Sequence, residues 1–508
     1  MTGKRVGVFG WGIVAPKSPD ITAFTRNLAE SVTWLAPFEG FGPSNFLAGI
    51  PDFRFDIYKK WIGERAAPRY YQTLIEKMDQ PTQFALGAFI QALGQNPGLE
   101  QELRALGTEA RVYVGTGLGN IDTVYRAGIE YQEAQRRWDR FWSEPARNSA
   151  LRDSGETPPR DHPEVEAAWR SEWAARSPEL HQYLAELAAL EEVPVEGPNI
   201  ELAKLGAIRE REKRRARLRD QWQAPEPPWS VSANVIWNLH NTPAAQVSIL
   251  GGIHGLTFAP VAACSTFGVS LRLAIDAIRA DDAKAVVVGA TDPPPHPLVV
   301  GAFYSGRVLS AGKHVSLPLS RFQGTHVAGG AAVWIVGDLD YFRSKGFQPL
   351  GMEPLAVGVS SDAAHIITPS TDGPPIAIRE ALARAEVSPD SLGTWDTHTT
   401  ATPGDVAEIS AMHSIFPPGV VVTARKGTFG HGMSASSGWE LTAQYLGFAR
   451  GALFPTPLSR ADLSEVIAAL HPNVVLDEAC QMPAGLAGKL SMGIGGINAC
   501  VISRPLER

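Results

Sequence analysis

Short apolar stretches alternate with helical patterns along most of the chain, and this alternation restricts the fold more than any other feature of the sequence. The apolar stretches have the length and β-branched content of buried strands. They cover residues 5–14, 110–119, 255–263, 284–290, 331–338, 354–360, 393–398, 419–424, 473–477 and 499–505. Amphipathic helical patterns lie between them at 81–95, 267–282, 373–387 and 435–451. Strand–helix alternation of this kind predicts an α/β fold built in layers.

The chain is long enough for more than one structural unit. Its 508 residues correspond to two to four units of ~150 residues. We predict a division near Lys345 and Gly346, with an N-terminal half over 1–345 and a C-terminal half over 346–508, each with the same strand–helix order. The sequence contains no short-period repeat, so it does not by itself establish a duplication.

A charge-dense segment at about 124–230 interrupts this pattern. Between residues 124 and 229, 37 of 106 residues are charged, against 62 of the other 402, and six of the thirteen tryptophans lie in the same segment. Its spacing and residue types favour helices. We therefore predict a largely helical, charged insertion. Within it, 209–219 carries seven basic and two acidic side chains, which indicates either a solvated helix or a docking surface for an acidic partner.

Composition excludes several classes of protein. A net charge of -7 argues against nucleic acid as the main partner. Three cysteines cannot form a disulfide framework, which favours a reducing, cytoplasmic location. No apolar run reaches the ~18 residues that cross a bilayer. The apolar run after Lys4 and Arg5 resembles a short signal peptide, but we interpret it as a buried strand because no small-residue cleavage site follows.

Cys264 lies between an apolar strand pattern and a helical pattern, in VAACSTFGVSLRL. This position predicts a sulfur at a helix N-terminus, where free N–H groups and the macrodipole favour a thiolate. A thiolate there is a nucleophile suited to acyl transfer. The alternative is a structural cysteine, since most buried cysteines act as small hydrophobic residues.

Three further motifs carry polar or glycine-rich chemistry. WDTHTTATPGDVAE has His398 after an apolar strand and hydroxyls at Thr400 and Thr402. TARKGTFGHGMS has Lys426 and His431 around a glycine-rich loop, and SMGIGGINACVI is a glycine-rich turn between strands. Each histidine alone could be structural. Two histidines and a lysine at strand ends, together with Cys264, fit acyl-thioester chemistry.

These motifs resemble those of the decarboxylating β-ketoacyl-acyl carrier protein synthases, the elongating condensing enzymes of the thiolase superfamily. The match runs from residue 5 to residue 505, apart from roughly 124–230. The matching segments are those around Cys264, His398 and Lys426–His431, the glycine turn at 493–496, the Gly-rich strand end at 112–120 and the loop at 360–370. The resemblance implies an α/β, thiolase-like duplicated fold of five layers, α-β-α-β-α, in which the charged helical segment is an insertion.

The resemblance also implies roles for individual residues. Cys264 would hold the acyl chain, with the backbone N–H groups of Cys264 and Ile494 as the oxyanion hole. His398 and His431 would bind the malonyl thioester carbonyl, and Lys426, paired with Glu408, would order this network. Thr400 and Thr402 would bind the phosphopantetheine arm, and Leu118 and Ile494 would lie near the acyl chain. No metal or free cofactor is implied, because the phosphopantetheine arm arrives on acyl carrier protein.

Several positions depart from the family pattern. Thr399 replaces the usual glycine after the histidine, and the following loop is one residue shorter. Ile494 replaces an aromatic gatekeeper, and the acidic and Arg-Pro-Phe-Asp-type residues are lost in PLSRFQGTHVAGGAAV (318–333). The catalytic set is therefore kept while the residues that gate substrate differ. This combination indicates a specialised member of the family.

We therefore predict an acyltransferase of the 3-oxoacyl-[acyl-carrier-protein] synthase type. It would condense a Cys-bound acyl group with a malonyl thioester by decarboxylative Claisen chemistry, in fatty-acid or polyketide-type biosynthesis. Its partner would be acyl carrier protein, and it would act as a homodimer, with a heterodimer as the alternative. Two other readings stay open: an acyltransferase or condensing enzyme that uses coenzyme A thioesters, and a non-catalytic partner subunit of a ketosynthase complex.

Overall fold

The computed structural model describes residues 4–40, 46–160, 162–190, 200–230, 234–366 and 370–506. Residues 367–369 of the predicted loop at 360–370, and residues 161 and 191–199 of the predicted insertion, lie outside the described residues. By its internal contacts the chain forms two units, one of residues 1–122 and 236–508, and one of residues 123–235.

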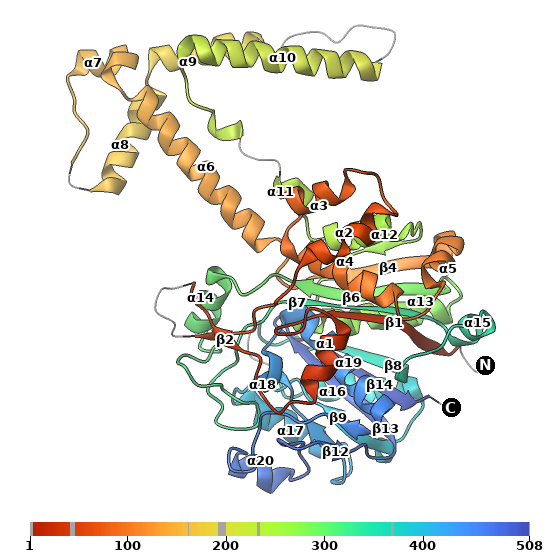
Figure 1. Ribbon diagram of the computed structural model, residues 1–508. Helices are drawn as coiled ribbons and strands as arrows, with labels where there is room; N and C mark the ends of the chain where they lie inside the picture. The colour runs from red at the N-terminus through yellow and green to blue at the C-terminus, as the bar shows by residue number, and fades with distance from the viewer. Residues whose placement is uncertain are drawn as a thin grey trace. The chain divides into compact units, whose positions relative to one another are not determined.

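The larger unit contains two five-stranded sheets of matching topology (Figure 1). In order across the first sheet the strands are β1 (Val6–Val14), β7 (Gly330–Asp338), β6 (Ala285–Asp292), β4 (Ala110–Gly115) and β5 (Thr257–Phe258). Across the second they are β8 (Met352–Ser361), β14 (Ile497–Pro505), β13 (Leu486–Gly493), β9 (Leu392–Asp396) and β10 (Val421–Thr423). In each sheet the first three strands are antiparallel neighbours and the last three are parallel neighbours. The duplicated fold that the resemblance implied is therefore confirmed.

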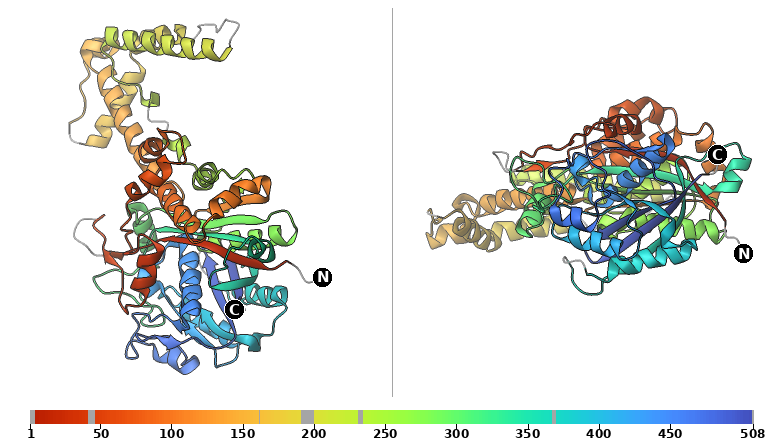
Figure 2. Two further views of the ribbon diagram at one scale, coloured as in Figure 1. Left: turned by 45° about the vertical axis from the view of Figure 1, so that its right-hand side comes forward. Right: turned by 90° about the horizontal axis from the view of Figure 1, so that it is seen from below.

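Helices cover both outer faces and fill the space between the sheets. α4 (Gln80–Leu93) and α12 (Thr242–Gly251) pack on the first sheet, and α16 (Gly373–Ala385) packs on the second. α13 (Thr266–Arg279) and α19 (Ser436–Arg450) contact strands of both sheets. The order of layers is thus α-β-α-β-α. Figure 2 shows the N-terminal strand β1 beside strands far along the chain, since its neighbour in the sheet is β7.

The remaining elements are short. Around the first sheet are α1 (Ile21–Leu28), β2 (Ala36–Pro37), β3 (Leu47–Ala48), α2 (Lys59–Gly63), α3 (Tyr70–Lys77), α5 (Leu99–Ala105), α11 (Asn234–Trp237), α14 (Pro297–Ser305) and α15 (Leu339–Ser344). Around the second are α17 (Gly404–His413), α18 (Lys426–Phe429), β11 (Ala452–Leu453), α20 (Glu465–Leu470) and β12 (Cys480–Gln481).

Two strand predictions were partly wrong. The stretch at 255–263 forms only the two-residue β5, because Pro260 has no N–H to donate to a ladder. The stretch at 473–477 makes a single bridge, Val422 with Val474, and its next hydrogen bond goes elsewhere, from Thr456 N to Leu476 O at 2.8 Å. Its backbone groups are divided between two segments, so no regular strand forms.

Matching 3₁₀ turns precede the two central helices. η5 (Ala263–Ser265) leads into α13, and η7 (Met433–Ala435) leads into α19. The first residue of each turn has a left-handed backbone, with φ of 48° at Ala263 and 49° at Met433. Non-glycine residues adopt this conformation only where the surroundings enforce it. Cys264 and Ser434 therefore occupy equivalent places in the two halves.

The unit of residues 123–235 is helical, as predicted. It contains most of α6 (Ile121–Trp142), then α7 (Ser149–Ser154), α8 (Pro163–Ala175), α9 (Pro178–Ala189) and α10 (Ile200–Trp222). Its core is aromatic: the ring of Trp142 packs against those of Trp138, Tyr183 and Trp222 at centroid distances of 5.5–6.0 Å. None of the helices in the described ranges is both long and apolar enough to cross a bilayer.

Candidate active site

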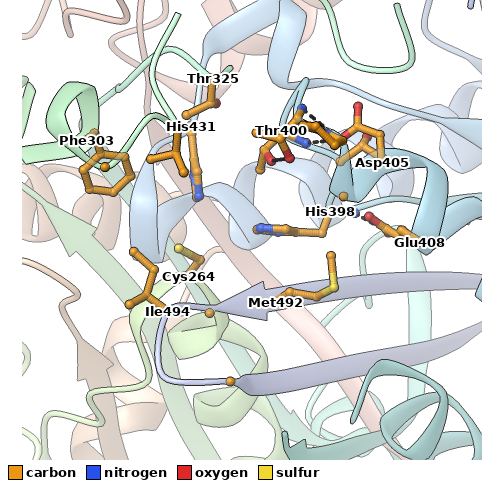
Figure 3. A pocket seen from close by; sticks show the side chains of 18 of the residues that line it. Cys264, Phe303, Thr325, His398, Thr400, Asp405, Glu408, His431, Met492 and Ile494 are labelled. Atoms are coloured by element: carbon orange, nitrogen blue, oxygen red, sulfur yellow. Dashed lines mark hydrogen bonds between the residues drawn. The ribbon is translucent and has the colours of Figure 1, made fainter. Parts of the chain in front are cut away.

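Loops from both halves meet at one pocket of about 350 Å³. Cys264 lies in the η5 turn of the first half, and His398 follows β9 of the second. His431 follows α18, and Ile494 lies in the turn between β13 and β14. Figure 3 shows the Cys264 sulfur and the two imidazoles pointing into the same space, with Ile494 beside the sulfur. The structure thus brings together four of the predicted site residues.

Burial controls the chemistry of Cys264. The side chain is 5% exposed, and burial raises the pKa of its thiol to about 11. The positive charge of Lys426 and the backbone N–H groups of Ile494 and Cys264 oppose this rise in pKa. The prediction that the helix N-terminus favours a thiolate was therefore wrong for the resting state, because the cost of desolvating the anion is larger. The resting group is the thiol.

The two histidines are buried neighbours. Their ring centroids lie 5.4 Å apart and the rings are nearly perpendicular, at 80°. Burial holds the pKa of both imidazoles well below the usual value of 6.5, and the charges of Lys426 and Lys489 act in the same direction. Both rings are therefore neutral at pH 7. Each then carries one N–H on its ring. His431 Nδ1 lies 3.3 Å from Ser436 Oγ.

Lys426 pairs with a different carboxylate from the one expected. Its Nζ donates to Glu440 Oε1 at 2.7 Å and to the carbonyl oxygen of His398 at 2.5 Å. Glu408 accepts instead from the backbone N–H of His398, at 2.7 Å. The predicted pairing of Lys426 with Glu408 is corrected to Glu440, because α19 brings that carboxylate under the lysine while Glu408 on α17 reaches the His398 backbone.

A buried chain of charges extends behind the histidines. Arg425 Nε lies 3.2 Å from Asp396 Oδ2, and Lys489 Nζ lies 3.6 Å from Asp396 Oδ1 and 2.7 Å from Glu440 Oε2. Sequence reasoning missed Arg425, Asp396, Lys489 and Glu440. One signal was present: Lys489 stands in the middle of an apolar stretch, LAGKLSMG, and a lone lysine in a buried strand requires partners.

The loop after His398 presents its hydroxyls to the pocket. Thr400 and Thr402 both line it, and their hydroxyl oxygens lie 3.0 Å apart. The Asp405 carboxylate fixes this loop by accepting from the backbone N–H groups of Thr400, Thr402 and Leu319. Thr399, the residue that departs from the family pattern, contacts Thr397 Oγ1 at 2.6 Å and also lines the pocket.

Leu118 lies outside the pocket lining. It packs with Phe303 and Met433 in an apolar cluster, and its backbone N–H donates to Asp292 Oδ1 at 2.7 Å. Phe303, which the sequence did not single out, belongs to this cluster and also lines the pocket (Figure 3). Other lining residues that sequence reasoning missed are Arg307, Thr325, Asp362, His365, Met492 and Asn498. Arg307 lies in a segment without a motif, whereas the other five lie in segments that the sequence singled out for neighbouring residues.

The glycine at 493 leaves space beside the Cys264 backbone. A Cβ at Gly493 would lie 3.3 Å from Cys264 N and 2.8 Å from the carbonyl oxygen of Ala262. Any side chain there would therefore occupy the space in front of the Cys264 backbone. With glycine, this space stays open beside Cys264 and Ile494, the two residues whose N–H groups the resemblance assigns to the oxyanion hole.

Comparison with known protein families gives two matches. The model of the beta-ketoacyl synthase N-terminal domain matches residues 206–340, and that of the C-terminal domain matches residues 353–458. Among curated proteins, Nodulation protein E of Rhizobium leguminosarum bv. trifolii is 28% identical over 267 residues, which cover 51% of this chain and 64% of that protein. The chloroplastic 3-oxoacyl-[acyl-carrier-protein] synthase I of Arabidopsis thaliana is 29% identical over 271 residues, which cover 51% and 56%. The chain spans less than two thirds of the length of these relatives.

Solved structures extend the likeness over the whole chain. The ishigamide ketosynthase/chain length factor has a TM-score of 0.69 at 18% sequence identity, and the match covers 100% of both chains. A beta-ketoacyl synthase from Burkholderia phymatum STM815 has a TM-score of 0.69 at 17% identity, covering 99% of this chain and 100% of that one. At this identity the likeness shows the fold. It includes β1 and β4, which precede the residues matched by the family models.

Proposed function

Since the chain belongs to the beta-ketoacyl synthase family, we propose that it condenses an acyl group held on Cys264 with a malonyl thioester. The observation that carries this proposal is the meeting of Cys264, His398 and His431 at one pocket, with the thiol from one half and the imidazoles from the other. A nucleophile facing two neutral N–H donors suits a reaction in which an acyl-enzyme meets an enolate.

In the first step the Cys264 sulfur attacks the carbonyl carbon of an acyl thioester. The oxyanion is held by the backbone N–H groups of Cys264 and Ile494, the new C–S bond forms, and the bond to the carrier sulfur breaks. The thiol proton of Cys264 passes to the departing carrier thiolate. Because the pKa of the resting thiol is about 11, this proton leaves as the carbon–sulfur bond forms rather than before.

In the second step the malonyl thioester loses CO2. The carboxylate's C–C bond breaks, and its electron pair becomes an enolate whose oxygen accepts hydrogen bonds from His398 and His431. The enolate carbon then attacks the acyl-Cys264 carbonyl, a C–C bond forms, and the Cys264 sulfur leaves as a thiolate that takes up one proton. The product is a β-ketoacyl thioester two carbons longer. Lys426 acts by donating a hydrogen bond to the carbonyl oxygen of His398.

We propose acyl carrier protein as the partner that delivers both thioesters, in fatty-acid or polyketide-type biosynthesis in the cytoplasm. Thr400 and Thr402 at the pocket support this, since their hydroxyls can bind the amides of a phosphopantetheine arm. We also propose a homodimer. β5 is an edge strand, and the neighbouring Ile249, Leu256 and Val261 are 60%, 56% and 57% exposed, so a second copy would cover an apolar edge that is otherwise open.

Intact-mass detection of acyl-Cys264 across a panel of acyl carriers tests this function. The wild-type chain should gain the acyl mass from a carrier protein and then release a β-ketoacyl product on addition of malonyl carrier. Acylation from coenzyme A thioesters at equal or greater rate would instead favour the coenzyme A alternative. No acylation from any donor, with a folded protein, would favour the partner-subunit alternative.

A further inference from the structure

Lys489 is the one member of the buried charge chain that lies on the central strand of the second sheet. Its side chain is fully buried, and β13 pairs it with Asp396 of β9. β9 leads directly into Thr397 and His398. Lys489 is therefore attached to the middle of the second sheet, beside the strand that presents the first histidine.

The two buried lysines make parallel contacts. Lys489 Nζ donates to the carbonyl oxygen of Thr397 at 2.9 Å, and Lys426 Nζ donates to the next carbonyl oxygen, that of His398, at 2.5 Å. Glu440 lies between them, with Oε2 at 2.7 Å from Lys489 and Oε1 at 2.7 Å from Lys426. One carboxylate thus holds two lysines, which in turn hold two consecutive peptide groups at the histidine.

The charge chain is not neutral. Arg425, Lys489 and Lys426 supply three positive charges, and Asp396 and Glu440 supply two negative ones. The carboxyls of Asp405 and Glu408 contact the loop at His398, so what opposes protonation of the imidazoles is the nearby positive charge of Lys489 and Lys426, which acts strongly in a buried site. Protonating an imidazole next to it would place like charges together.

We propose that Lys489 is a positioning residue for the condensing reaction: with Lys426 it fixes the backbone of Thr397 and His398, and its charge adds to burial in keeping both imidazoles in the neutral form that donates to the enolate. This inference rests on the function proposed above and extends it to a residue that touches no substrate. Lys426 alone is not enough, because without Lys489 the site loses one positive charge near the histidines and the Thr397 carbonyl loses this donor.

Two substitutions separate the charge from the hydrogen bond. Lys489→Met removes both, whereas Lys489→Gln keeps a donor for the Thr397 carbonyl and removes the charge. Lys17→Met, which breaks an exposed pair with Glu30, is the matched control for losing a lysine. Thermal unfolding identifies variants that fail to fold.

Misplacement of a reacting group by ~1 Å costs roughly 100-fold in rate. Lys489→Met should therefore slow malonyl thioester decarboxylation by about that factor, while acylation of Cys264 stays within a few-fold of wild type. The acidic limb of the decarboxylation pH profile should move to higher pH in both Lys489 variants, because loss of a positive charge raises the pKa of the histidines. Lys17→Met should show neither effect.

Other titratable groups face the histidines and need a control. These are Cys264, Lys426, Glu440, Asp396, Asp405 and Glu408. Burial raises the pKa of Glu408 to about 7 and those of Asp396 and Asp405 to about 6. If the acidic limb of the pH profile still shifts when Lys489→Met is combined with Glu408→Gln, the limb belongs to the histidines. A limb that disappears in the combination belongs to Glu408 and contradicts the proposed role.

A readout that does not need turnover keeps this inference separate from the proposed function. Titration of the imidazole carbons by NMR should show a higher pKa for His398 in Lys489→Met than in the wild type. If the wild type does not decarboxylate malonyl thioesters, the proposed function is wrong, and NMR still decides the effect of Lys489 on the histidine. An unchanged histidine pKa, or equal losses in acylation and decarboxylation, would overturn the role assigned to Lys489.

Discussion

The two halves of the larger unit fold alike and use the same turn for opposite purposes. In the first half, η5 presents Cys264 to the pocket, and the strand that ends beside this turn finishes at Gly493. In the second half, η7 presents Ser434, and the equivalent strand β6 finishes at Asp292. The Asp292 carboxylate accepts from Ser434 N at 2.7 Å. The N–H of Ser434 is therefore occupied by the protein, whereas the N–H of Cys264 is the one that we propose for the oxyanion of a substrate.

This difference shows that the local fold alone does not make a site. The first residue of each turn has a left-handed backbone, and each turn leads into a central helix. The residue at the end of the facing strand decides whether an anion from outside can bind. A glycine supplies no anion, whereas the aspartate supplies its own and ties the end of β6 to η7 and to the loop of Thr116, Gly117 and Leu118.

The difference between the η5 and η7 turns can be tested most strongly at the nucleophile. Cys264→Ala should abolish acyl transfer without unfolding the protein, because it removes one sulfur atom. Adding Ser434→Cys should not restore transfer, because the N–H group of residue 434 is held by Asp292. Intact mass after exposure to acyl carrier protein is the measurement. Acylation at position 434 would show that the two turns are interchangeable.

Filling the open position should have the next largest effect. In Gly493→Ala the new Cβ lies in front of Cys264 N, so the oxyanion loses a donor, and acylation should fall by roughly 100- to 1000-fold. Gly419→Ala is the control, because a Cβ there meets nothing within 4 Å. Stopped-flow acylation rates give the comparison, and a rate equal to that of the control would exclude this position from the oxyanion hole.

The buried carboxyl of Glu408 in the second half should make the stability of the fold depend on pH. Burial raises the pKa of both Asp292 and Glu408. Asp292 accepts from three backbone N–H groups, whereas Glu408 accepts from one, and its pKa rises from 4.5 to about 7. Because the folded protein holds this proton more tightly than the unfolded chain, Glu408 contributes most stability below pH 4.5 and loses it as the pH rises to about 7.

Glu408→Gln removes this pH dependence. We therefore expect the difference in free energy of unfolding between Glu408→Gln and wild type, measured in urea, to rise between pH 4.5 and pH 7 and to stay level above pH 7. The rise should be up to about 3 kcal/mol, at 1.36 kcal/mol per pKa unit. A difference that does not vary with pH would show that the carboxyl titrates normally.

The pocket entrance should give a smaller effect. Ile494 is 44% exposed and lies beside the Cys264 sulfur in the half that supplies the histidines. Ile494→Phe should shift the preferred acyl length or slow acylation, with about a fourfold change per methylene at ~0.8 kcal/mol. An unchanged acyl-length profile would show that other residues, such as Phe303, contact the chain.

The insertion gives the smallest expected effect, and it distinguishes the halves in another way. It lies between β4 and β5, whereas the matching strands β9 and β10 are joined by α17 alone. On α10, Arg214 and Arg215 already pair with Glu210 and Glu212, which favours a solvated helix. Charge reversal at Arg214, Arg215 and Arg217 should slow transfer from carrier protein only a few-fold, and salt should weaken the effect. An equal loss with small thioesters would indicate a structural role.

Much of this architecture could be predicted because its signals are local. The apolar period around 284–290 and 331–338 reports burial directly, and the corresponding strands formed. The partner of Lys426 could not be read in this way. Glu440 and Glu408 are both acidic residues near the motifs, and only the packing of α19 between the sheets decides which one reaches the lysine. The prediction of a thiolate at Cys264 was wrong for a related reason, since the depth of burial is a property of the whole fold.

Pairing of the first strand with a distant one has a consequence for synthesis on the ribosome. β1 is buried along its whole length, and its hydrogen-bonding partner in the sheet is β7, which begins at Gly330. At ~5–20 residues per second, roughly 15 to 60 seconds separate the emergence of the two strands. During that interval the chain exposes an apolar edge that only later residues can cover. We therefore expect chaperones to bind the nascent N-terminus, and expect truncation before β7 to yield aggregates rather than a folded fragment.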